Sequence, residues 1–160
     1  MLISQYAYFG LSSPVTSAAE MAAVLGIEPD EISVRGSRWG EPRPRPALHY
    51  WKIVCREPAM SVNQQIEHIM ERLAPHVDAI AALARQLSAE DDRSGAVLEI
   101  VRMFNDDEGQ DRLACTPPEL IDGHNLLGWH LDRDVLDFLH ATRAVLDVDE
   151  YDCAEGADDD

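Results

Sequence analysis

The stretch from Ser61 to Leu87 limits the possible folds more than any other part of the sequence. Its apolar residues recur at spacings of three and four, which is typical of a helix packed by one face against a sheet. Ser61 can cap the start of this helix. Pro75 falls inside the pattern, where it removes an intrahelical hydrogen bond, so we predict a kink or break with Pro75 opening a second segment. The apolar positions are Val62, Ile66, Ile69, Met70, Leu73, Val77, Ile80, Leu83, Ala84 and Leu87.

Shorter patterns on both sides of this stretch predict the remaining elements. A helix capped by Thr16 or Ser17 should end at Gly26, and a second should start at Asp132. In the strand at 48–56, alternate residues should form one face, with His49, Trp51, Ile53 and Cys55 on the same side. The second helix should face inward with Val135, Leu136, Leu139 and Ala141. The expected strands are 4–11, 31–35, 48–56, 96–104, 126–131 and 145–151.

The order of these elements predicts the fold class. Strands and helices mix along the chain, and the first six follow the βαββαβ order of ferredoxin-like folds. We therefore predict an α+β protein with an antiparallel or mixed sheet, helices packed on one face, and a ferredoxin-like-related order. Residues 1–151 should form a single domain, followed by a disordered acidic tail at 152–160 that lacks periodicity.

The acidic composition narrows the range of partners. The chain has 30 acidic and 13 basic residues, for a net charge of −17. Five of the 30 acids follow Tyr151, so the part before the tail still carries 25 acids against 13 bases. Such a surface disfavours binding to nucleic acid or to an anionic membrane, and it can steer a basic partner, although it also serves solubility alone. Without a signal sequence or an apolar run long enough to cross a bilayer, we expect a cytoplasmic protein.

One segment concentrates positive charge in this acidic chain. Arg35, Arg38, Arg43 and Arg45 surround Trp39 on a loop stiffened by proline and glycine. Arginine and tryptophan are enriched at interface hot spots, and guanidinium groups bind carboxylates and phosphates through paired hydrogen bonds. These five residues are therefore candidates for partner binding. The alternative is that the arginines pair with the protein's own acids and that Trp39 packs into the sheet.

No motif assigns catalytic, cofactor or metal chemistry. The sequence lacks GxSxG, GxGxxG, P-loop and HExxH patterns, and its three cysteines form no CxxC pair. The nearest metal candidates are His124, His130, Asp132 and Asp134, but their spacing matches no known signature, and Asp132 is already explained as a helix cap. We therefore assign no catalytic residue, cofactor or metal ligand.

An ordered set of motifs resembles the uncharacterised bacterial family called domain of unknown function 4279. The resemblance extends from about Tyr6 to Tyr151, and the proline-dense Arg43–Pro46 stretch and the acidic tail depart from it. It implies a fold rather than a catalytic site, and it implies that immunity proteins, which neutralise toxins from neighbouring genes, occur among relatives. The motifs are the aromatic first strand, a helix ending in Leu-Gly-Ile-Glu-Pro, the Arg/Gly turn at 35–40, the strand with His49-Tyr50-Trp51, the helix with Glu71-Arg72-Leu73-Ala74-Pro75, and the closing Leu-Asp-Val-Asp-Glu-Tyr.

Together these observations favour a noncatalytic interaction protein. Its most specific form is an immunity-type inhibitor that covers a basic toxin, with the acidic body steering association. The alternative is a small-molecule or anion-binding module, or an enzyme without a recognisable motif, that uses a pocket near Arg38, Trp51 and Trp129. The sequence does not predict the oligomeric state.

Overall fold

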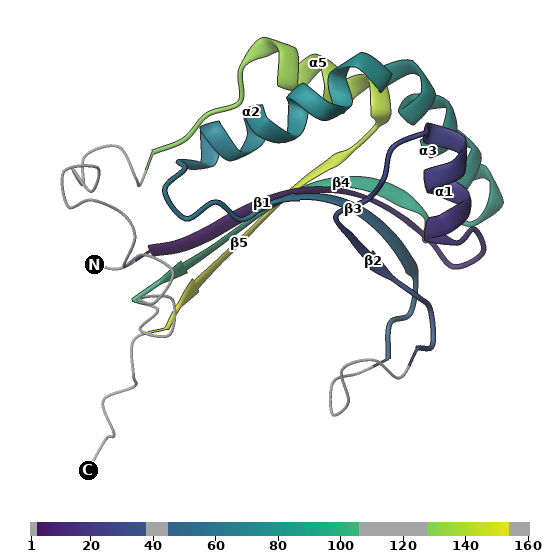
Figure 1. Ribbon diagram of the computed structural model, residues 1–160, viewed down its shortest axis with the longest axis horizontal. Coiled ribbons are helices and arrows are strands. Elements are labelled where there is room, and N and C mark those ends of the chain that lie inside the picture. The colour runs from purple at the N-terminus through teal and green to yellow at the C-terminus, as the bar shows by residue number, and fades with distance from the viewer. Residues whose placement is uncertain (1–2, 38–44, 106–127, 154–160) are drawn as a thin grey trace.

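The computed structural model describes residues 3–37, 45–105 and 128–153, which form a curved sheet covered by helices on one face (Figure 1). The sheet has five strands in the order β2-β3-β1-β4-β5. All neighbours are antiparallel except β4 and β5, which are parallel. The strands are β1 (Ile3–Ser13), β2 (Glu31–Ser33), β3 (His49–Cys55), β4 (Gly95–Phe104) and β5 (Val145–Asp152).

This arrangement confirms the predicted fold class. The order β2-β3-β1-β4 is the antiparallel order of a ferredoxin-like sheet, read from one edge. β5 extends that sheet beyond β4 by a parallel pairing, which makes the whole sheet mixed. The crossover that a parallel pairing needs includes the last helix, α5 (Arg133–Thr142).

The other helices begin and end where the sequence indicates. α1 (Ala18–Leu25) and α2 (Val62–Leu73) each start with a serine capping box, at Ser17 and Ser61, and α1 ends at Gly26, whose φ of 65° favours glycine. The break predicted at Pro75 is a 3₁₀ turn (Ala74–His76) between α2 and α3 (Val77–Glu90). The bend lets α2 and α3 follow the curvature of the sheet below them (Figure 1).

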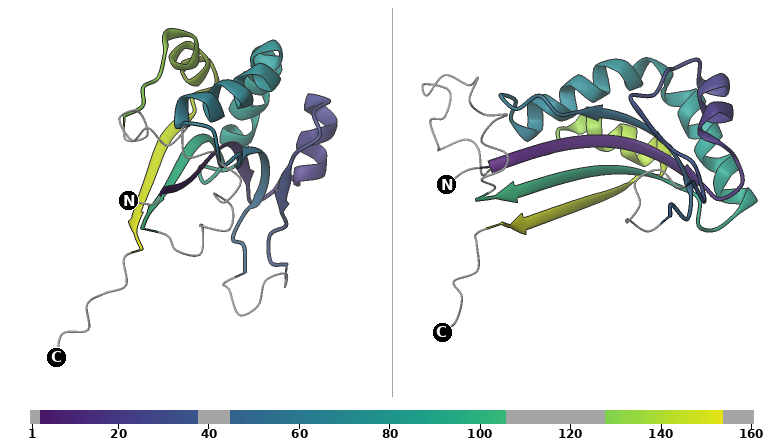
Figure 2. Two further views of the ribbon diagram at one scale, coloured as in Figure 1. Left: turned by 60° about the vertical axis from the view of Figure 1, so that its left-hand side comes forward. Right: turned by 60° about the horizontal axis from the view of Figure 1, so that its bottom comes forward.

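The core lies between the sheet and these helices, which all lie on the same side of it (Figure 2). Alternate residues of β1, β3 and β4 point into it, and the apolar stripe of α2 and α3 meets them. Burying each large aliphatic or aromatic side chain stabilises the fold by about 1.5–3 kcal/mol. The largest completely buried side chains include Phe9, Leu11, Trp51, Ile53, Ile69, Leu73, Ile80, Leu87, Leu98 and Ile100.

Two glutamines are buried at one end of this core. Gln65 on α2 donates from Nε2 to the backbone oxygens of Gln5 (3.1 Å) and Glu57 (3.3 Å). Gln5 on β1 donates from Nε2 to the backbone oxygen of Met60 (3.1 Å). These bonds fix the start of α2 against the first strand.

The structure differs from the predictions in the C-terminal part of the chain. Residues 128–131 are not a strand, and 126–127 lie outside the described residues. In α5 the buried face is Val135, Phe138, Leu139 and Thr142, because these positions share one side of a helix that starts at Arg133. The prediction for Leu136 and Ala141 was therefore wrong: both are exposed.

The last strand also continues one residue beyond the predicted domain boundary. Asp152 belongs to β5, and the N–H of Cys153 donates to the carbonyl of Phe104 (2.8 Å). The rest of the predicted acidic tail, 154–160, lies outside the described residues. No helix in the described ranges is long and apolar enough to span a bilayer.

Candidate binding groove

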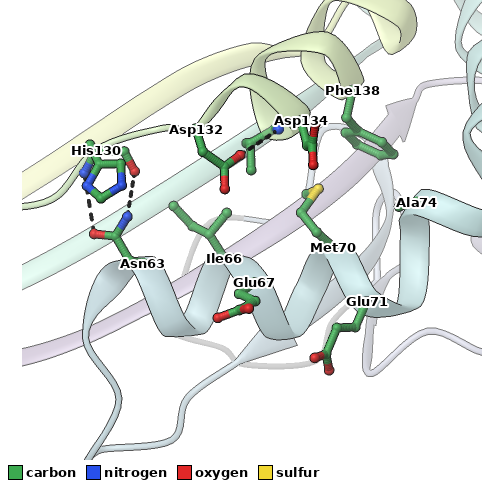
Figure 3. Close-up of a pocket in the computed structure, with 11 residues that line it drawn as sticks. Asn63, Ile66, Glu67, Met70, Glu71, Ala74, His130, Asp132, Asp134 and Phe138 are labelled. Carbon is green, nitrogen blue, oxygen red and sulfur yellow. Dashed lines mark hydrogen bonds between the residues drawn. The ribbon is translucent and has the colours of Figure 1, made fainter.

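A groove of about 450 Å³ opens between α2 and α5 on the helical side of the molecule (Figure 3). α2 contributes one wall, and α5 with the segment preceding it contributes the other. The two walls are far apart in the sequence and meet only through the fold. The lining residues are Asn63, Ile66, Glu67, Met70, Glu71, Ala74, His130, Asp132, Asp134, Val135 and Phe138.

The floor of the groove is apolar and continuous with the core. Ile66, Val135 and Phe138 are buried, and Met70 packs against the core from above. The Phe138 ring meets the Phe9 ring of β1 edge to face, with centroids 5.3 Å apart. A ligand that reaches the floor therefore contacts side chains that the fold already holds in place.

The rim of the groove is acidic. Glu67 and Glu71 are four residues apart and share one face of α2, and Asp132 and Asp134 stand opposite at the start of α5. All four side chains are exposed. Asp132 caps α5 by accepting a hydrogen bond from the N–H of Val135 (3.0 Å).

No cation balances this rim among the residues that line the groove. The described lining contains no lysine or arginine. Arg72, the residue next to Glu71, instead binds Asp30, with Nη1 at 2.8 and 2.7 Å from the two carboxylate oxygens. The groove thus combines an apolar floor with four carboxylates that have no basic partner in its walls.

A pair of hydrogen bonds holds the two walls together at one end. The Asn63 side chain donates to the carbonyl of His130 (2.7 Å) and accepts from the His130 N–H (3.3 Å), as drawn in Figure 3. Asn63 lies in the first turn of α2, so this contact fixes the segment before α5 against that turn. The separation of the walls is therefore built into the fold.

The metal candidates from the sequence are partly brought together here. His130, Asp132 and Asp134 all line the groove, whereas His124 lies outside the described residues. In the part of the chain that the structure describes, no three His, Cys, Asp or Glu side chains are close enough to hold a metal ion. The groove is thus suited to a ligand that brings its own positive charge and an apolar surface.

The opposite face of the sheet is not covered by any described helix (Figure 2). It carries tyrosines whose rings lie beneath lysine and arginine side chains. Lys52 Nζ lies 3.9 Å from the ring centroid of Tyr8, and Arg56 Cζ lies 4.0 Å from that of Tyr6. Arg56 also pairs with Glu31 at 2.9 Å. We call this set the tyrosine face: Tyr6, Tyr8, Gly10, Glu31, Tyr50, Lys52, Arg56 and Glu99.

Tyr8 is the centre of the tyrosine face. Its hydroxyl donates to the Glu99 carboxylate on the neighbouring strand, and its ring lies close to position 10, where a side chain would be crowded. A Cβ at Gly10 would lie 3.3 Å from Tyr8 Cε2 and 3.6 Å from Lys52 Cγ. Burial, together with the bond to Glu99, raises the pKa of Tyr8 far above its ordinary value, and burial lowers the pKa of Lys52. On this face Tyr8 thus pairs with Glu99, and Arg56 pairs with Glu31.

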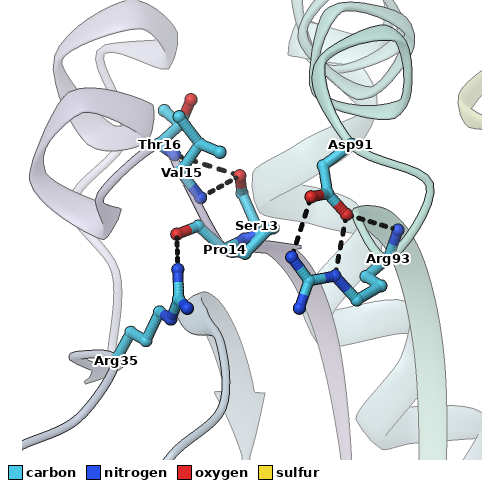
Figure 4. Close-up of polar contacts among 7 residues, drawn as sticks. All are labelled: Ser13, Pro14, Val15, Thr16, Arg35, Asp91 and Arg93. Atoms are coloured by element: carbon cyan, nitrogen blue, oxygen red, sulfur yellow. Dashed lines mark hydrogen bonds and ion pairs between the residues drawn. The ribbon is translucent and has the colours of Figure 1, made fainter.

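Of the arginine loop predicted from the sequence, the structure describes only the two ends, which belong to the connection between β2 and β3 and do not line the groove. The Arg35 side chain donates to the carbonyl of Pro14 (2.9 Å; Figure 4), and Arg45 is exposed. Gly36 N–H donates to the carbonyl of Pro46 (2.9 Å), which closes the base of the connection. Arg38, Trp39 and Arg43 lie outside the described residues, so the five-residue site stays a prediction.

The two tryptophans that we expected near a pocket, Trp51 and Trp129, pack into or against the core instead. Trp51 is completely buried, and its indole N–H donates to the carbonyl of Ile27 (3.2 Å). Trp129 is partly buried against the core. Neither side chain lines the groove between α2 and α5.

Comparison with known families agrees with the sequence motifs. The family model for a domain of unknown function, DUF4279, matches residues 3–153. The chain belongs to the DUF4279 family. The match includes the groove, the tyrosine face and all five strands of the DUF4279 sheet. No curated protein and no solved structure matches the chain.

The sequence reasoning missed most of the groove residues. Glu67 and Glu71 are ordinary polar positions of a surface helix until α5 is placed beside them. One signal was available, because Met70 extends the apolar stripe of α2 sideways and lies between those two acids. The apolar stripe of α2 is therefore wider than packing on the sheet alone requires. Such a width indicates that a second element packs against the helix.

Proposed function

We propose that this DUF4279 protein is a noncatalytic interaction protein that binds a basic protein partner in the groove between α2 and α5. The observation that supports it is the unbalanced rim: four carboxylates border an apolar floor without a lysine or arginine in the described walls. A partner helix or loop with Lys or Arg beside an apolar side chain complements both parts. This is the helix-in-groove type of recognition, in which apolar anchors give affinity and charges give orientation.

The charge of the whole chain supports the same class of partner. A net charge of −17 attracts a basic protein from a distance and repels phosphates and carboxylates. For an anion the groove is unfavourable, because the ligand would meet four like charges. The open rim also suits a macromolecular ligand, since pockets for small molecules enclose most of the ligand surface.

In its more specific form, the proposal is that the partner is a basic toxin and that binding inhibits it. Covering a functional surface of the toxin requires an interface but no chemistry from the inhibitor. The absence of a recognisable catalytic motif in the sequence fits this form. Small basic ligands such as polyamines are the competing occupants.

The test is a comparison of three tagged proteins in a pull-down from lysate of the native host at low and high salt. They are the wild type, the groove variant Glu67→Lys/Asp134→Lys, and the control Glu57→Lys/Asp92→Lys, which makes the same charge change at exposed acids outside the groove. We expect one basic protein to be retained by the wild type and the control but lost by the groove variant. Raising the salt to 1 M should weaken retention, because the Debye length falls to about 3 Å.

Two outcomes contradict the proposal. Equal loss of the partner in the groove variant and the control would show that only net charge matters, and no retained protein would remove the basic partner altogether. If a partner is captured, its expression alone should stop growth and co-expression of this chain should restore it. If expression of the partner does not affect growth, the partner is not a toxin, but the proposed interaction would still stand.

A further inference from the structure

A second candidate binding surface is β5, the strand at one edge of the sheet, whose outer backbone groups pair with no other described strand. It pairs with β4 on one side only, over eight residues in continuous register from Val145 to Asp152. Within the described ranges, no strand follows it in the sheet order. Figures 1 and 2 show β5 along the border of the sheet, beyond β4.

The backbone direction of β5 follows from one hydrogen bond. Cys153 N–H donates to Phe104 of β4, so the odd-numbered residues before it direct their N–H groups toward β4. Since these groups alternate along an extended strand, the N–H groups of Leu146, Val148 and Glu150 face the free edge. These groups, with their carbonyls, are the template to which another strand can add.

The side chains of β5 specify what kind of strand fits. On the helix-covered side, Leu146 and Val148 are 38% and 37% exposed, although both lie beside core residues of β4. On the opposite side, Asp147 and Asp149 are separated by one residue, and no ion pair involves either of them among the described residues. Over residues 146–149, an added strand therefore meets apolar side chains on one face and two carboxylates on the other. Beyond them, Glu150 is paired with Arg102, and the Tyr151 hydroxyl donates to Asp149 (3.0 Å).

The same two aspartates act against pairing with a second copy of the chain. In an antiparallel pair of β5 strands centred on Val148, Asp147 of each copy lies opposite Asp149 of the other. Like charges directly opposite one another destabilise a strand pair. An edge that repels its own copy and attracts opposite charge favours a different chain.

We propose that the free edge of β5 accepts an extended segment of a partner protein in which Lys or Arg alternates with Val, Ile or Leu. The basic residues lie opposite Asp147 and Asp149, and the apolar residues cover Leu146 and Val148. The backbone hydrogen bonds of the edge supply affinity, and the alternation supplies specificity. The proposal concerns a surface separate from the groove and does not rest on the function proposed for it.

The test uses a fluorescent seven-residue peptide, blocked at both ends, that alternates lysine and valine, with a peptide of the same composition in two blocks as the control. Binding is measured by anisotropy. We expect the alternating peptide to bind at least tenfold more tightly than the block peptide. Val148→Pro should weaken binding at least tenfold, because it removes an edge-facing N–H and leaves the bonds to β4 intact.

A second variant keeps the test independent of the proline. Asp147→Lys/Asp149→Lys should also weaken binding at least tenfold, whereas Glu67→Lys/Asp134→Lys, with the same charge change at the groove, should leave it within twofold. Circular dichroism and thermal unfolding check that each variant folds. The groove can fail its own pull-down without affecting this result, and the reverse is also true.

Three results would overturn the proposal. Equal affinity for the alternating and block peptides would reduce the interaction to charge alone. Unchanged affinity of folded Val148→Pro would exclude backbone pairing at this edge. A concentration-dependent dimer of the wild type that Val148→Pro dissolves would show that a second copy, rather than a basic partner, occupies β5.

Discussion

The groove and the tyrosine face differ in whether their charged side chains have partners of opposite charge. On the tyrosine face, Lys52 and Arg56 each lie over a tyrosine ring, and Glu31 and Glu99 balance them. In the groove, the carboxylates have no cation in the described walls. Within the described residues, the tyrosine face balances its cations with carboxylates, whereas the groove walls leave four carboxylates without a basic partner.

This difference indicates where to look for function in a protein without a catalytic motif. An uncovered sheet face rich in aromatic residues is often taken as a binding surface, and four tyrosines lie on this one, counting Tyr151 on β5. Here Lys52 lies over the ring of Tyr8 and Arg56 over the ring of Tyr6, and Tyr8 and Arg56 each have a carboxylate partner. The unpaired carboxylates of the groove indicate a binding site more strongly than the tyrosines do. Like charges placed close together reduce the stability of the fold.

The largest expected effect tests whether the groove floor belongs to the core. Phe138→Ala removes the contact with Phe9 and leaves a cavity, so it should reduce the free energy of unfolding by about 3–5 kcal/mol. The matched control Leu136→Ala, at an exposed position of the same helix, should cost less than about 1 kcal/mol. Urea denaturation measures both, and equal losses would show that the floor is not part of the core.

The next effect tests how tightly the tyrosine face is assembled. Gly10→Val places a branched side chain where even a Cβ would lie 3.3 Å from the Tyr8 ring. Displacing Tyr8 and Lys52 should destabilise the protein by about 1–3 kcal/mol, despite the better strand propensity of valine. Ser4→Val on the same strand face is the control, and a comparable loss there would contradict the close packing around Gly10.

A smaller effect concerns the pH dependence of the tyrosine face. Tyr8→Phe removes the bond to Glu99 and should cost about 1 kcal/mol near neutral pH. Because the pKa of Tyr8 is raised in the folded state, only the unfolded state releases its proton just above pH 10. The wild type should then lose stability relative to Tyr8→Phe, by up to about 1.4 kcal/mol per pH unit. Urea denaturation from pH 8 to 11 measures this, and a constant difference between the two proteins would contradict the raised pKa.

The smallest effect has the opposite sign and tests the groove. Glu71→Gln relieves repulsion from Glu67, so it should stabilise the protein by about 0.2–0.5 kcal/mol at low salt and by less in 1 M salt. The neighbouring Arg72→Gln loses the pair with Asp30 and should destabilise it by less than about 1 kcal/mol. Thermal and urea unfolding at both salt concentrations distinguish the gain of stability in Glu71→Gln from the loss in Arg72→Gln. A loss of stability in Glu71→Gln would show that its carboxylate is balanced.

Local sequence patterns predicted most of the fold. The apolar period over 61–87, the serine caps and Pro75 each act within a few residues, and all of them have their expected structural effect. The alternation in β3 likewise placed Trp51, Ile53 and Cys55 inside. Two predictions in the C-terminal part were wrong. Residues 128–131 are not a strand, and two apolar positions on the outer side of α5 resembled an inward pattern while Phe138 was overlooked.

The candidate sites could not be predicted in the same way. The groove depends on how α2 lies beside α5, and these helices are separated in the sequence by α3, by β4 and by residues outside the described ranges. The tyrosine face depends on strand register, since Gly10 meets Lys52 and Tyr8 meets Glu99 only across neighbouring strands. The arginine loop was predicted as a site because its residues are adjacent in the sequence; Arg35 donates a hydrogen bond to the backbone of Pro14, and the site as a whole stays a prediction.

The two buried glutamines bear on which alternative structures the chain avoids. If β1 shifted by one residue relative to its neighbours, Gln5 would turn to the uncovered face and Gln65 would lose an acceptor inside the core. An amide left unpaired in an apolar interior costs about 1–3 kcal/mol, in addition to the apolar residues that the shift would expose. Shifted registers of β1 therefore have a higher free energy than the native one. Apolar contacts alone would tolerate several alignments of this central strand, and the two glutamine amides favour only one of them.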